Sequence, residues 1–193
     1  MKATSASAVV LVGLGGAGAL TASAGLLRPP GGQDEASLIA QCNRCGRCVS
    51  VCHTRAIGTA TLSDGIASVR TPVMRFNLGS CDFCGDCAKV CPTQALRPFD
   101  VDAARAGNVE AAKIGVAVID PDTCLGWVSD SCNLCYAKCP YQAIELDVRK
   151  HPVVLEDRCN GCGVCENVCP VLSFRSYIGG TMRAVRVETE VRS

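Results

Sequence analysis

Aromatic residues are scarce in this sequence, with Phe, Trp and Tyr at 4% of 193 residues and a single Trp. The apolar fraction of 48% rests largely on Ala, Val and Cys. A conventional core of Leu, Ile and Phe would therefore be thin. Small domains of this kind usually need disulfides or bound metals for stability.

A marked excess of either charge is also lacking. The formal net charge of +1 gives no electrostatic reason to expect nucleic acid or a strongly acidic surface partner. No nucleophile–base pair, phosphate-binding loop or pair of carboxylates with catalytic spacing stands out. The sequence therefore predicts a protein that is not an enzyme and that has no catalytic residues of its own.

What the sequence does contain is sixteen cysteines in four tight groups, with long cysteine-free stretches between them. Disulfide frameworks scatter their cysteines to join distant segments, so this clustering argues against them. Zinc sites pair one C-x2-C hook with a second, distant hook, and groups of four exceed that need. The groups are Cys42, Cys45, Cys48, Cys52; Cys81, Cys84, Cys87, Cys91; Cys124, Cys132, Cys135, Cys139; and Cys159, Cys162, Cys165, Cys169.

Three of the groups read C-x2-C-x2-C-x3-C, which is the pattern of bacterial [4Fe–4S] ferredoxins. Two-residue spacers let three thiolates surround one cube, while the fourth cysteine reaches the neighbouring cluster. We therefore predict that all sixteen cysteines are metal ligands of four [4Fe–4S] clusters, with no other cofactor. Folding and cluster insertion should then be coupled, and the cluster-free chain should be unfolded or molten.

The third group departs from the pattern, because seven residues separate Cys124 from Cys132. This longer arm carries Trp127 and still supplies the first thiolate. It is expected to alter the solvent exposure of one cluster. Neither histidine is needed as a ligand: His53 is expected at the surface or in a structural role, and His151 is expected to be solvated.

From residue 38 onward the chain repeats a unit of strand, cysteine loop, short helix and strand. The pattern predicts an α+β fold of tandem bacterial dicluster ferredoxin-like units, with short strands and helices around the four clusters. Residues 28–180 form this four-cluster domain as two pseudo-symmetric dicluster units. Strands are expected at 115–119 and 152–155 and a short helix within 100–114. Residues 181–193 form a C-terminal tail or an edge strand.

Residues 1–27 differ from the rest, since an uncharged run of small and apolar residues follows Lys2. This segment is expected to be a signal peptide or a membrane anchor. Residues 13–18 match G-x-G-x-x-G, but the second strand and acidic residue of a dinucleotide site do not follow. We therefore interpret that match as part of a Gly-rich hydrophobic segment.

The chain resembles the ferredoxin-type NapG/MauM proteins, periplasmic four-cluster electron carriers of nitrate reduction and methylamine utilisation. The resemblance lies in Leu27-Arg28-Pro29-Pro30-Gly31, Cys42-Asn43-Arg44-Cys45-Gly46-Arg47-Cys48, the odd third group, and Cys159-Asn160-Gly161-Cys162-Gly163. It covers roughly residues 26–178. It implies electron transfer from a membrane quinol-oxidising polyferredoxin of the NapH/MauN type to a periplasmic redox enzyme or cytochrome.

The resemblance also implies a location and a ligand pairing. The protein would lie in the periplasm or on the extracytoplasmic face of the membrane, held there by its partner or its N-terminal segment. A cytoplasmic location stays open, because no Arg-Arg pair precedes the apolar run.

Such proteins also look like four-cluster subunits of molybdopterin oxidoreductases, which implies nested pairing of the first group with the fourth and the second with the third. The rival is sequential pairing of neighbouring groups. The nested sets would be Cys42, Cys45, Cys48 with Cys169; Cys159, Cys162, Cys165 with Cys52; Cys81, Cys84, Cys87 with Cys139; and Cys124, Cys132, Cys135 with Cys91.

Two other functions could use the same cysteine groups. The chain could be a permanent electron-transfer subunit of a molybdopterin oxidoreductase or hydrogenase complex. An enzyme that does chemistry at an open cluster would leave one iron with only three thiolates, and complete sets of four cysteines argue against it.

Overall fold

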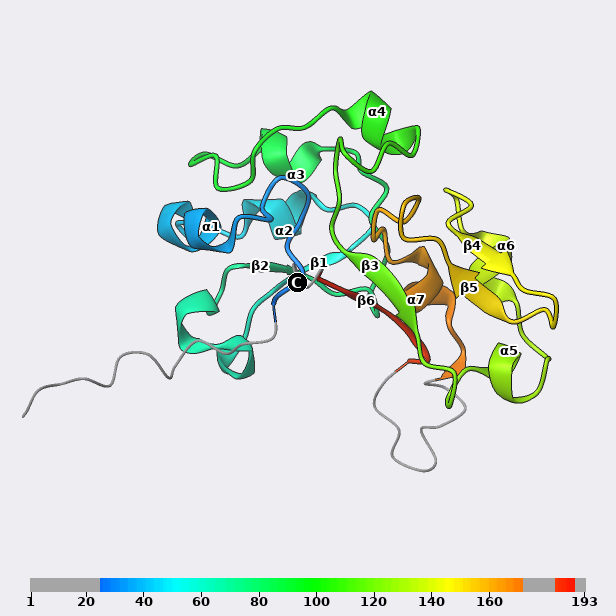
Figure 1. The fold of residues 1–193 in the computed structure, drawn as a ribbon. Helices are drawn as coiled ribbons and strands as arrows, with labels where there is room; N and C mark the ends of the chain where they lie inside the picture. Colours follow the sequence, from blue (N-terminus) through cyan, green and yellow to red (C-terminus); the bar gives the residue numbers. More distant parts are fainter. Residues whose placement is uncertain (1–24, 172–182, 190–193) are drawn as a thin grey trace, which may run out of the picture.

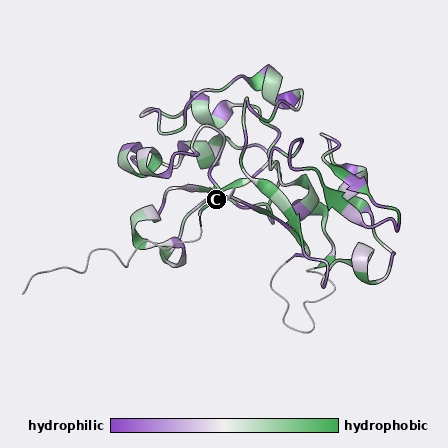
Figure 2. Ribbon diagram, viewed as in Figure 1, coloured by the Kyte–Doolittle hydropathy of each residue, from purple (hydrophilic) through white to green (hydrophobic). Residues whose placement is uncertain are grey.

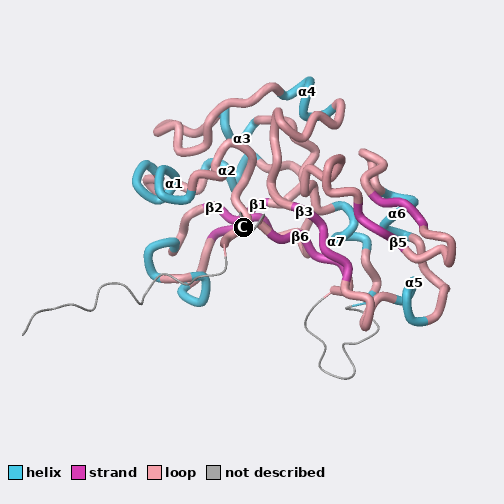
Figure 3. The backbone as a smooth tube through the Cα atoms, viewed as in Figure 1, coloured by secondary structure: helices cyan, strands magenta, loops and turns pink. Residues whose placement is uncertain are grey.

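A computed structural model describes residues 25–171 and 183–189, which form two halves lying side by side (Figure 1). Each half is built from short helices and strands joined by long loops (Figure 3), and the mixed α+β class is confirmed. The first half contains α1 Glu35–Gln41, α2 Arg47–Val51, β1 Ile57–Thr59, the short 3-10 turns η1 Leu62–Asp64 and η2 Ile66–Ser68, β2 Pro72–Met74, α3 Asp86–Lys89 and α4 Val101–Arg105. The second half contains β3 Val116–Ile119, α5 Leu125–Val128, α6 Leu134–Lys138, β4 Ile144–Leu146, β5 Pro152–Val154, α7 Val164–Val168 and β6 Val185–Glu188.

The second half has an inner and an outer strand pair. The inner antiparallel pair, β4–β5, joins the two cysteine loops, with Ile144 opposite Val154. The outer antiparallel pair, β3–β6, joins the start of the half to its end, with Ala117 opposite Val187. Strand, loop, helix and strand thus occur twice in this half. The strands expected at 115–119 and 152–155 are confirmed as β3 and β5.

The first half repeats this plan with a looser outer pair. Its inner antiparallel hairpin is β1–β2, with Ile57 opposite Met74. In place of a regular outer sheet, the backbone N–H of Arg97 donates to the carbonyl of Gly31 at 3.0 Å. The helix expected within 100–114 is α4, which begins after Asp100, whose carboxylate accepts the N–H of Ala103.

The core is small and contains cysteines among its buried residues, as the scarcity of aromatics predicts. In the first half Phe83, Leu38 and Leu96 are almost fully buried, beside Cys87. In the second half Ile144, Val171 and Val185 are buried with cysteines between them. Hydrophobic residues follow the strands of this half, which Figure 2 shows in green. The elements are too short to bury a large apolar face, so the groups held by the cysteines must supply much of the interior.

The two halves are joined by backbone hydrogen bonds and by aromatic packing. The N–H of Cys81 donates to the carbonyl of Cys162 at 2.8 Å, and the N–H of Ile114 donates to that of Asn160 at 2.9 Å. The rings of Phe83 and Tyr141 meet edge to face, 6.2 Å apart. Contacts of this kind hold the halves in a fixed relative position.

The segments expected at the two ends of the chain fall partly outside the described residues. The predicted signal or anchor segment lies mostly in residues 1–24, which are not described. Among the described residues, no helix is long and apolar enough to cross a membrane. Of the closing residues 181–193, the described part forms β6, whose Val185 and Val187 are buried against β3 and α7.

Candidate metal centres

The three regular cysteine loops share one backbone conformation. In each, the second spacer residue has a positive φ, and a glycine with positive φ then begins the short helix. The first set is Arg44, Phe83 and Gly161, with φ of 57°, 54° and 73°; the second is Gly46, Gly85 and Gly163, with φ of 75°, 76° and 78°. This repeated left-handed geometry curls each loop around a common centre.

A side chain in the first spacer position supports the same curl. Asn43, Asp82 and Asn160 each accept a hydrogen bond from the backbone N–H two residues later, at 3.3, 3.3 and 3.2 Å. Asn and Asp form such turns readily, because their short side chains reach the nearby backbone. An Asn or Asp directly after the first cysteine is therefore a further sequence signal of this loop, and the cysteine spacing alone does not include it.

The loops bring the sixteen cysteines into four sets of four, and no two of them form a disulfide. We call these sets sites I to IV after the group that supplies three of the thiols. Site I is Cys42, Cys45, Cys48 and Cys91; site II is Cys81, Cys84, Cys87 and Cys52; site III is Cys124, Cys132, Cys135 and Cys169; site IV is Cys159, Cys162, Cys165 and Cys139.

Cavities and electrostatic coupling define these sets. The four thiols of site I line one cavity, as do those of site III and those of site IV. For site II, burial raises the pKa of Cys81 and Cys87, and the charge of the neighbouring Cys52 raises both further. In every set the fourth cysteine comes from the neighbouring group of the same half.

The nested pairing implied by the resemblance is therefore wrong for this chain. Cys169 lies with the third group and not with the first, and Cys52 lies with the second and not with the fourth. The reason is the fold of each half: the inner hairpin places its two cysteine loops back to back, so the helix after each loop carries the fourth cysteine to its immediate neighbour. Sequential pairing, the rival expectation, is what the structure has.

Burial dominates the electrostatics of the thiols. It raises the pKa of Cys48 to about 11 and those of Cys87, Cys135 and Cys162 to about 12, and the charges of nearby cysteines add to the effect. Thiolates packed this closely need a compensating positive charge. Iron supplies it, because the thiolate is the form that binds metal.

The surroundings of the thiols also suit a negatively charged cluster. Backbone N–H groups point at four of the sulfur atoms: Phe83 at Cys81, Leu96 at Cys91, Ala117 at Cys159 and Ala143 at Cys139, at 3.3 to 3.5 Å. Such hydrogen bonds stabilise thiolate ligands and tune the potential of a cluster. At Cys91, burial acts to raise the thiol pKa, but hydrogen bonds from Leu96 and Thr93 outweigh it, so the pKa is lowered.

One buried donor lacks an acceptor where a cluster would provide one. Asn160 is 1% exposed and lines the cavity of site IV. Its side chain lies near enough to the Tyr141 hydroxyl to act against the rise in the pKa of that group, but its Nδ2 has no partner within hydrogen-bond distance among the described residues. An unsatisfied buried donor is costly. The sulfides of a [4Fe–4S] cluster are acceptors, so the residues present fit this cofactor.

The long arm of the third group is a short helix fixed to the neighbouring hairpin. Trp127, on α5, stacks on His151 with ring centroids 4.5 Å apart, and its Nε1–H donates to the carbonyl of Pro152 at 3.1 Å. His151 lies between Asp130 and Asp147, at 3.3 Å from each, with 12% of its side chain exposed. The expectation of a solvated His151 was wrong, because the inserted arm folds over it.

His53 is a surface residue, as expected. Its Nε2 lies 3.2 Å from a carboxylate oxygen of Asp82, and 57% of its side chain is exposed. His53 also approaches Cys84 and Asp86 closely enough to share a metal ion. Cys84 already belongs to site II, so this trio is not a separate centre.

The four sites follow one another in the order I, II, IV, III. The charge of Cys48 in site I adds to the raised pKa of Cys87 in site II, and the charge of Cys135 in site III adds to the raised pKa of Cys165 in site IV. The hydrogen bond between Cys81 and Cys162 joins sites II and IV at the contact between the halves. Tyr141 lies at this contact. Burial raises the pKa of its hydroxyl, and the charges of Cys162 and Cys81 raise it further.

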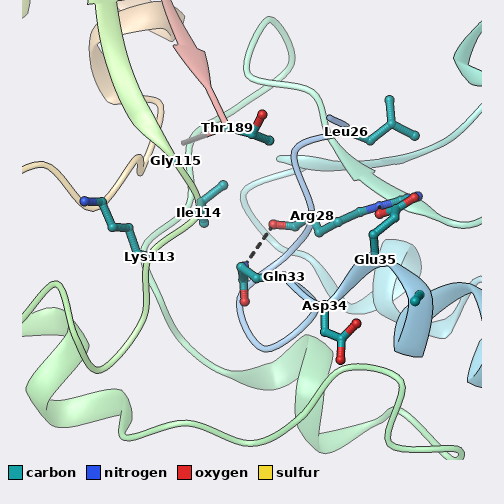
Figure 4. A pocket seen from close by; sticks show the side chains of 10 residues that line it. Leu26, Arg28, Gln33, Asp34, Glu35, Lys113, Ile114, Gly115 and Thr189 are labelled. Carbon is teal, nitrogen blue, oxygen red and sulfur yellow. Dashed lines mark hydrogen bonds and ion pairs between the residues drawn. The ribbon is translucent and has the colours of Figure 1, made fainter. Parts of the chain in front are cut away.

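A groove of about 750 Å³ lies away from the cysteines. It is lined by residues of the 26–36 segment together with Lys113, Gly115 and Thr189 (Figure 4). Its buried cation, Arg28, is satisfied by Glu35, Thr71 and the carbonyl of Pro72. This cation of the groove is therefore fully engaged within the protein.

Two of the three ranges that known families match coincide with the halves, and the third crosses the boundary between them. The description "4Fe-4S dicluster domain" matches residues 41–95 and 80–128 in one family and residues 117–175 in another. The first match spans the cysteines of sites I and II, and the last spans those of sites III and IV. The chain therefore contains 4Fe-4S dicluster domains and binds [4Fe–4S] clusters.

Individual relatives give the family. The ferredoxin-type protein NapG of Escherichia coli is 34% identical over 156 residues, which cover 74% of this chain and 65% of the relative. The chain thus spans slightly less than two thirds of that relative's length. The methylamine utilization ferredoxin-type protein MauM of Methylorubrum extorquens is 37% identical over 158 residues, covering 77% of this chain and 70% of the relative. The ferredoxin-type protein NapF of Haemophilus influenzae is 38% identical over 149 residues, covering 75% of each chain. With these relatives, its cysteine loops and its dicluster halves, the chain belongs to the ferredoxin-type NapG/MauM family.

Proposed function

We propose that the protein carries four [4Fe–4S] clusters, one on each of sites I to IV, and relays electrons along them. The observation that carries the proposal is the arrangement of the sites in one continuous order. Within each half the short helices of neighbouring cysteine loops pack together, α2 on α3 and α6 on α7, and between the halves the N–H of Cys81 donates to the carbonyl of Cys162. A [4Fe–4S] cluster, when bound, would accept and donate one electron at each site. The protein supplies ligands, burial and hydrogen bonds that set each potential.

In this role the electrons come from a membrane quinol-oxidising protein of the NapH/MauN type and pass to a redox enzyme or cytochrome. The names of the relatives, which link NapG to ferredoxins and MauM to methylamine utilization, support a place in such a redox chain. The protein works in the periplasm or on the extracytoplasmic face of the membrane. The apolar segment within residues 1–27 supports this location.

A permanent place in a molybdopterin oxidoreductase or hydrogenase complex is the alternative. Likeness to the four-cluster subunits of molybdopterin enzymes implied nested ligand pairing, and this chain has the sequential pairing instead. That observation favours an independent carrier.

Anaerobic purification with iron counting and redox-monitored EPR tests the proposal. Four clusters of four irons predict roughly sixteen irons per chain. Reduction should give the magnetic interaction of neighbouring [4Fe–4S]⁺ clusters within each half. About eight irons per chain would rule out the four-cluster relay. Fractionation of the native host would test the location, with recovery in the cytosol counting against it.

A further inference from the structure

Positive charge is concentrated around one end of the series of sites. Residues 36–81 contain five arginines and a single acid, Asp64, and two acids that border this stretch, Glu35 and Asp82, are paired with Arg28 and Arg105. Asp64 is already paired with Arg75 at 2.6 Å. Within the described residues, none of the other four arginines forms an ion pair. The net charge of +1 conceals this local excess, so the sequence-based expectation of no acidic partner overlooked it.

Three of these arginines surround site I. Arg44, Arg47 and Arg70 are exposed and line the same cavity as its cysteines. Arg44 is fixed in place, because its guanidinium donates to the carbonyls of Val69 at 3.0 Å and Ala67 at 3.1 Å. The positive charge is therefore held over site I by the structure and does not depend on mobile side chains alone.

Site I is also the most accessible of the four. Cys45 is the one exposed cysteine among the sixteen. Beside it lies an open depression of about 610 Å³, lined by Cys45, Arg47, Lys89 and Pro92 among others. A redox centre of a partner can approach Cys45 here, whereas most thiols of sites III and IV are buried.

The other end of the series has the opposite charge. Residues 120–158, which surround site III and the β4–β5 hairpin, contain seven acids and four basic residues. The two ends therefore differ in sign. An acidic protein would be drawn to site I and repelled from the end at site III.

From these observations we propose that the face formed by Arg44, Arg47, Arg70 and Cys45 docks an electron-transfer protein whose surface around its redox centre is acidic. This inference rests on the proposed relay function and adds the point at which one partner exchanges electrons with it. An anionic membrane would also attract arginines. The exposed thiol of Cys45 at the centre of the basic face favours a redox protein, because a lipid surface does not exchange electrons with a cluster.

The test uses the holoprotein and a reduced flavodoxin with an acidic surface as the probe. In the reaction, flavodoxin hydroquinone gives one electron to the protein and one proton to water and becomes the neutral semiquinone, and one [4Fe–4S]²⁺ cluster becomes [4Fe–4S]⁺. The variant is Arg47→Glu/Arg70→Glu, since neither side chain has a partner among the described residues. The control is Arg149→Glu/Lys150→Glu, which makes the same change of charge at the exposed β4–β5 turn.

The stopped-flow rate constant for the wild type should fall as salt is raised. The Arg47→Glu/Arg70→Glu variant should react about 10-fold more slowly at low salt and lose most of this salt dependence, while the control stays within about 2-fold of wild type. Equal rates in the two variants would overturn the proposal. So would loss of binding to phosphatidylglycerol vesicles in the Arg47→Glu/Arg70→Glu variant with an unchanged flavodoxin rate. Iron content and dithionite-reduced EPR spectra, measured on each sample, separate this outcome from failure of the four-cluster relay itself.

Discussion

The backbone N–H of Cys81 donates a hydrogen bond to the carbonyl of Cys162 at 2.8 Å, and this contact joins two cluster sites from different halves of the chain. Cys81 belongs to site II and Cys162 to site IV, and each is the cysteine through which its site contacts the other half. Replacement of the neighbouring Tyr141 with Leu keeps an apolar side chain at this contact but removes the ring that packs on Phe83.

Electron transfer between the halves should be the step most sensitive to this contact. In Tyr141→Leu, the rate at which electrons equilibrate between the two halves after rapid reduction should fall, while equilibration within each half is unchanged. Freeze-quench EPR at successive times measures both. A uniform slowing in both halves would indicate a general loosening and contradict this role.

The sequential pairing of ligands predicts a non-additive effect of substitutions. Cys132→Ala/Cys135→Ala should remove the cluster of site III. Adding Cys169→Ala to this variant should cost no further iron, because Cys169 already belongs to the lost site. Iron counting and EPR of the oxidised protein are the measurements. Appearance of a [3Fe–4S] signal on adding Cys169→Ala would show that this cysteine serves another site, as the nested pairing requires.

Two glycines with the same backbone conformation should differ sharply in their tolerance of a methyl group. A Cβ at Gly163 would lie 2.0 Å from the ring of Phe76, whereas a Cβ at Gly46 meets nothing within 4 Å. Both have a positive φ, so each Ala variant loses about 1 kcal/mol from the backbone. Overpacking adds about 1–3 kcal/mol at Gly163 alone.

We expect Gly163→Ala to lose its cluster absorbance at a temperature roughly 3–10 °C below that of Gly46→Ala. Phe76→Leu should relieve part of this loss in a double variant with Gly163→Ala, because it removes the clashing ring. If Phe76→Leu does not restore stability, the loss in Gly163→Ala comes from the backbone conformation and not from the clash with the ring.

The inserted arm of the third group should protect one site. Trp127→Ala removes both the stacking on His151 and the hydrogen bond to Pro152, so α5 should detach from β5 and expose site III. Each interaction contributes roughly 1 kcal/mol. Exposure to oxygen should then destroy the cluster of site III first.

Trp127→Phe is the matched control, since it keeps a ring for stacking and loses only the hydrogen bond. It should lie between wild type and Trp127→Ala. EPR during timed exposure to air follows the individual clusters. If a cluster of the first half is lost before that of site III, the arm has no protective role.

Removal of iron should unfold the chain and should be promoted by acid. Burial raises the pKa of Cys87 and Cys162 to about 12, so these thiols take up protons once their iron is gone. Protons therefore compete with iron, and a fixed concentration of chelator should act faster at about pH 6.5 than at about pH 8.5. Cluster absorbance and near-UV circular dichroism should decline together. Native-like circular dichroism in the iron-free chain would contradict coupled folding.

Much of the site was predictable because its information is local. A spacing such as Cys159-x2-Cys162-x2-Cys165 requires only a short curled loop, and that loop forms with the same φ values wherever the spacing occurs. Strands such as β3 and β5 were also predicted, because short apolar runs precede their cysteine loops. His151 was misread, since nothing in its own neighbourhood indicates that Trp127 folds over it.

The sequence by itself determined the cofactor, the α+β class and the two-by-two repetition, since each depends on residue types at fixed short spacings. The tertiary structure alone decided which cysteine completes which site, because the path of the inner hairpins sets where Cys52, Cys91, Cys139 and Cys169 arrive. It also decided that the arginines scattered between residues 44 and 70 gather over the exposed Cys45. Electrostatic attraction depends on where charges lie in space and not on their sum, so the net charge of +1 does not indicate the basic face at site I.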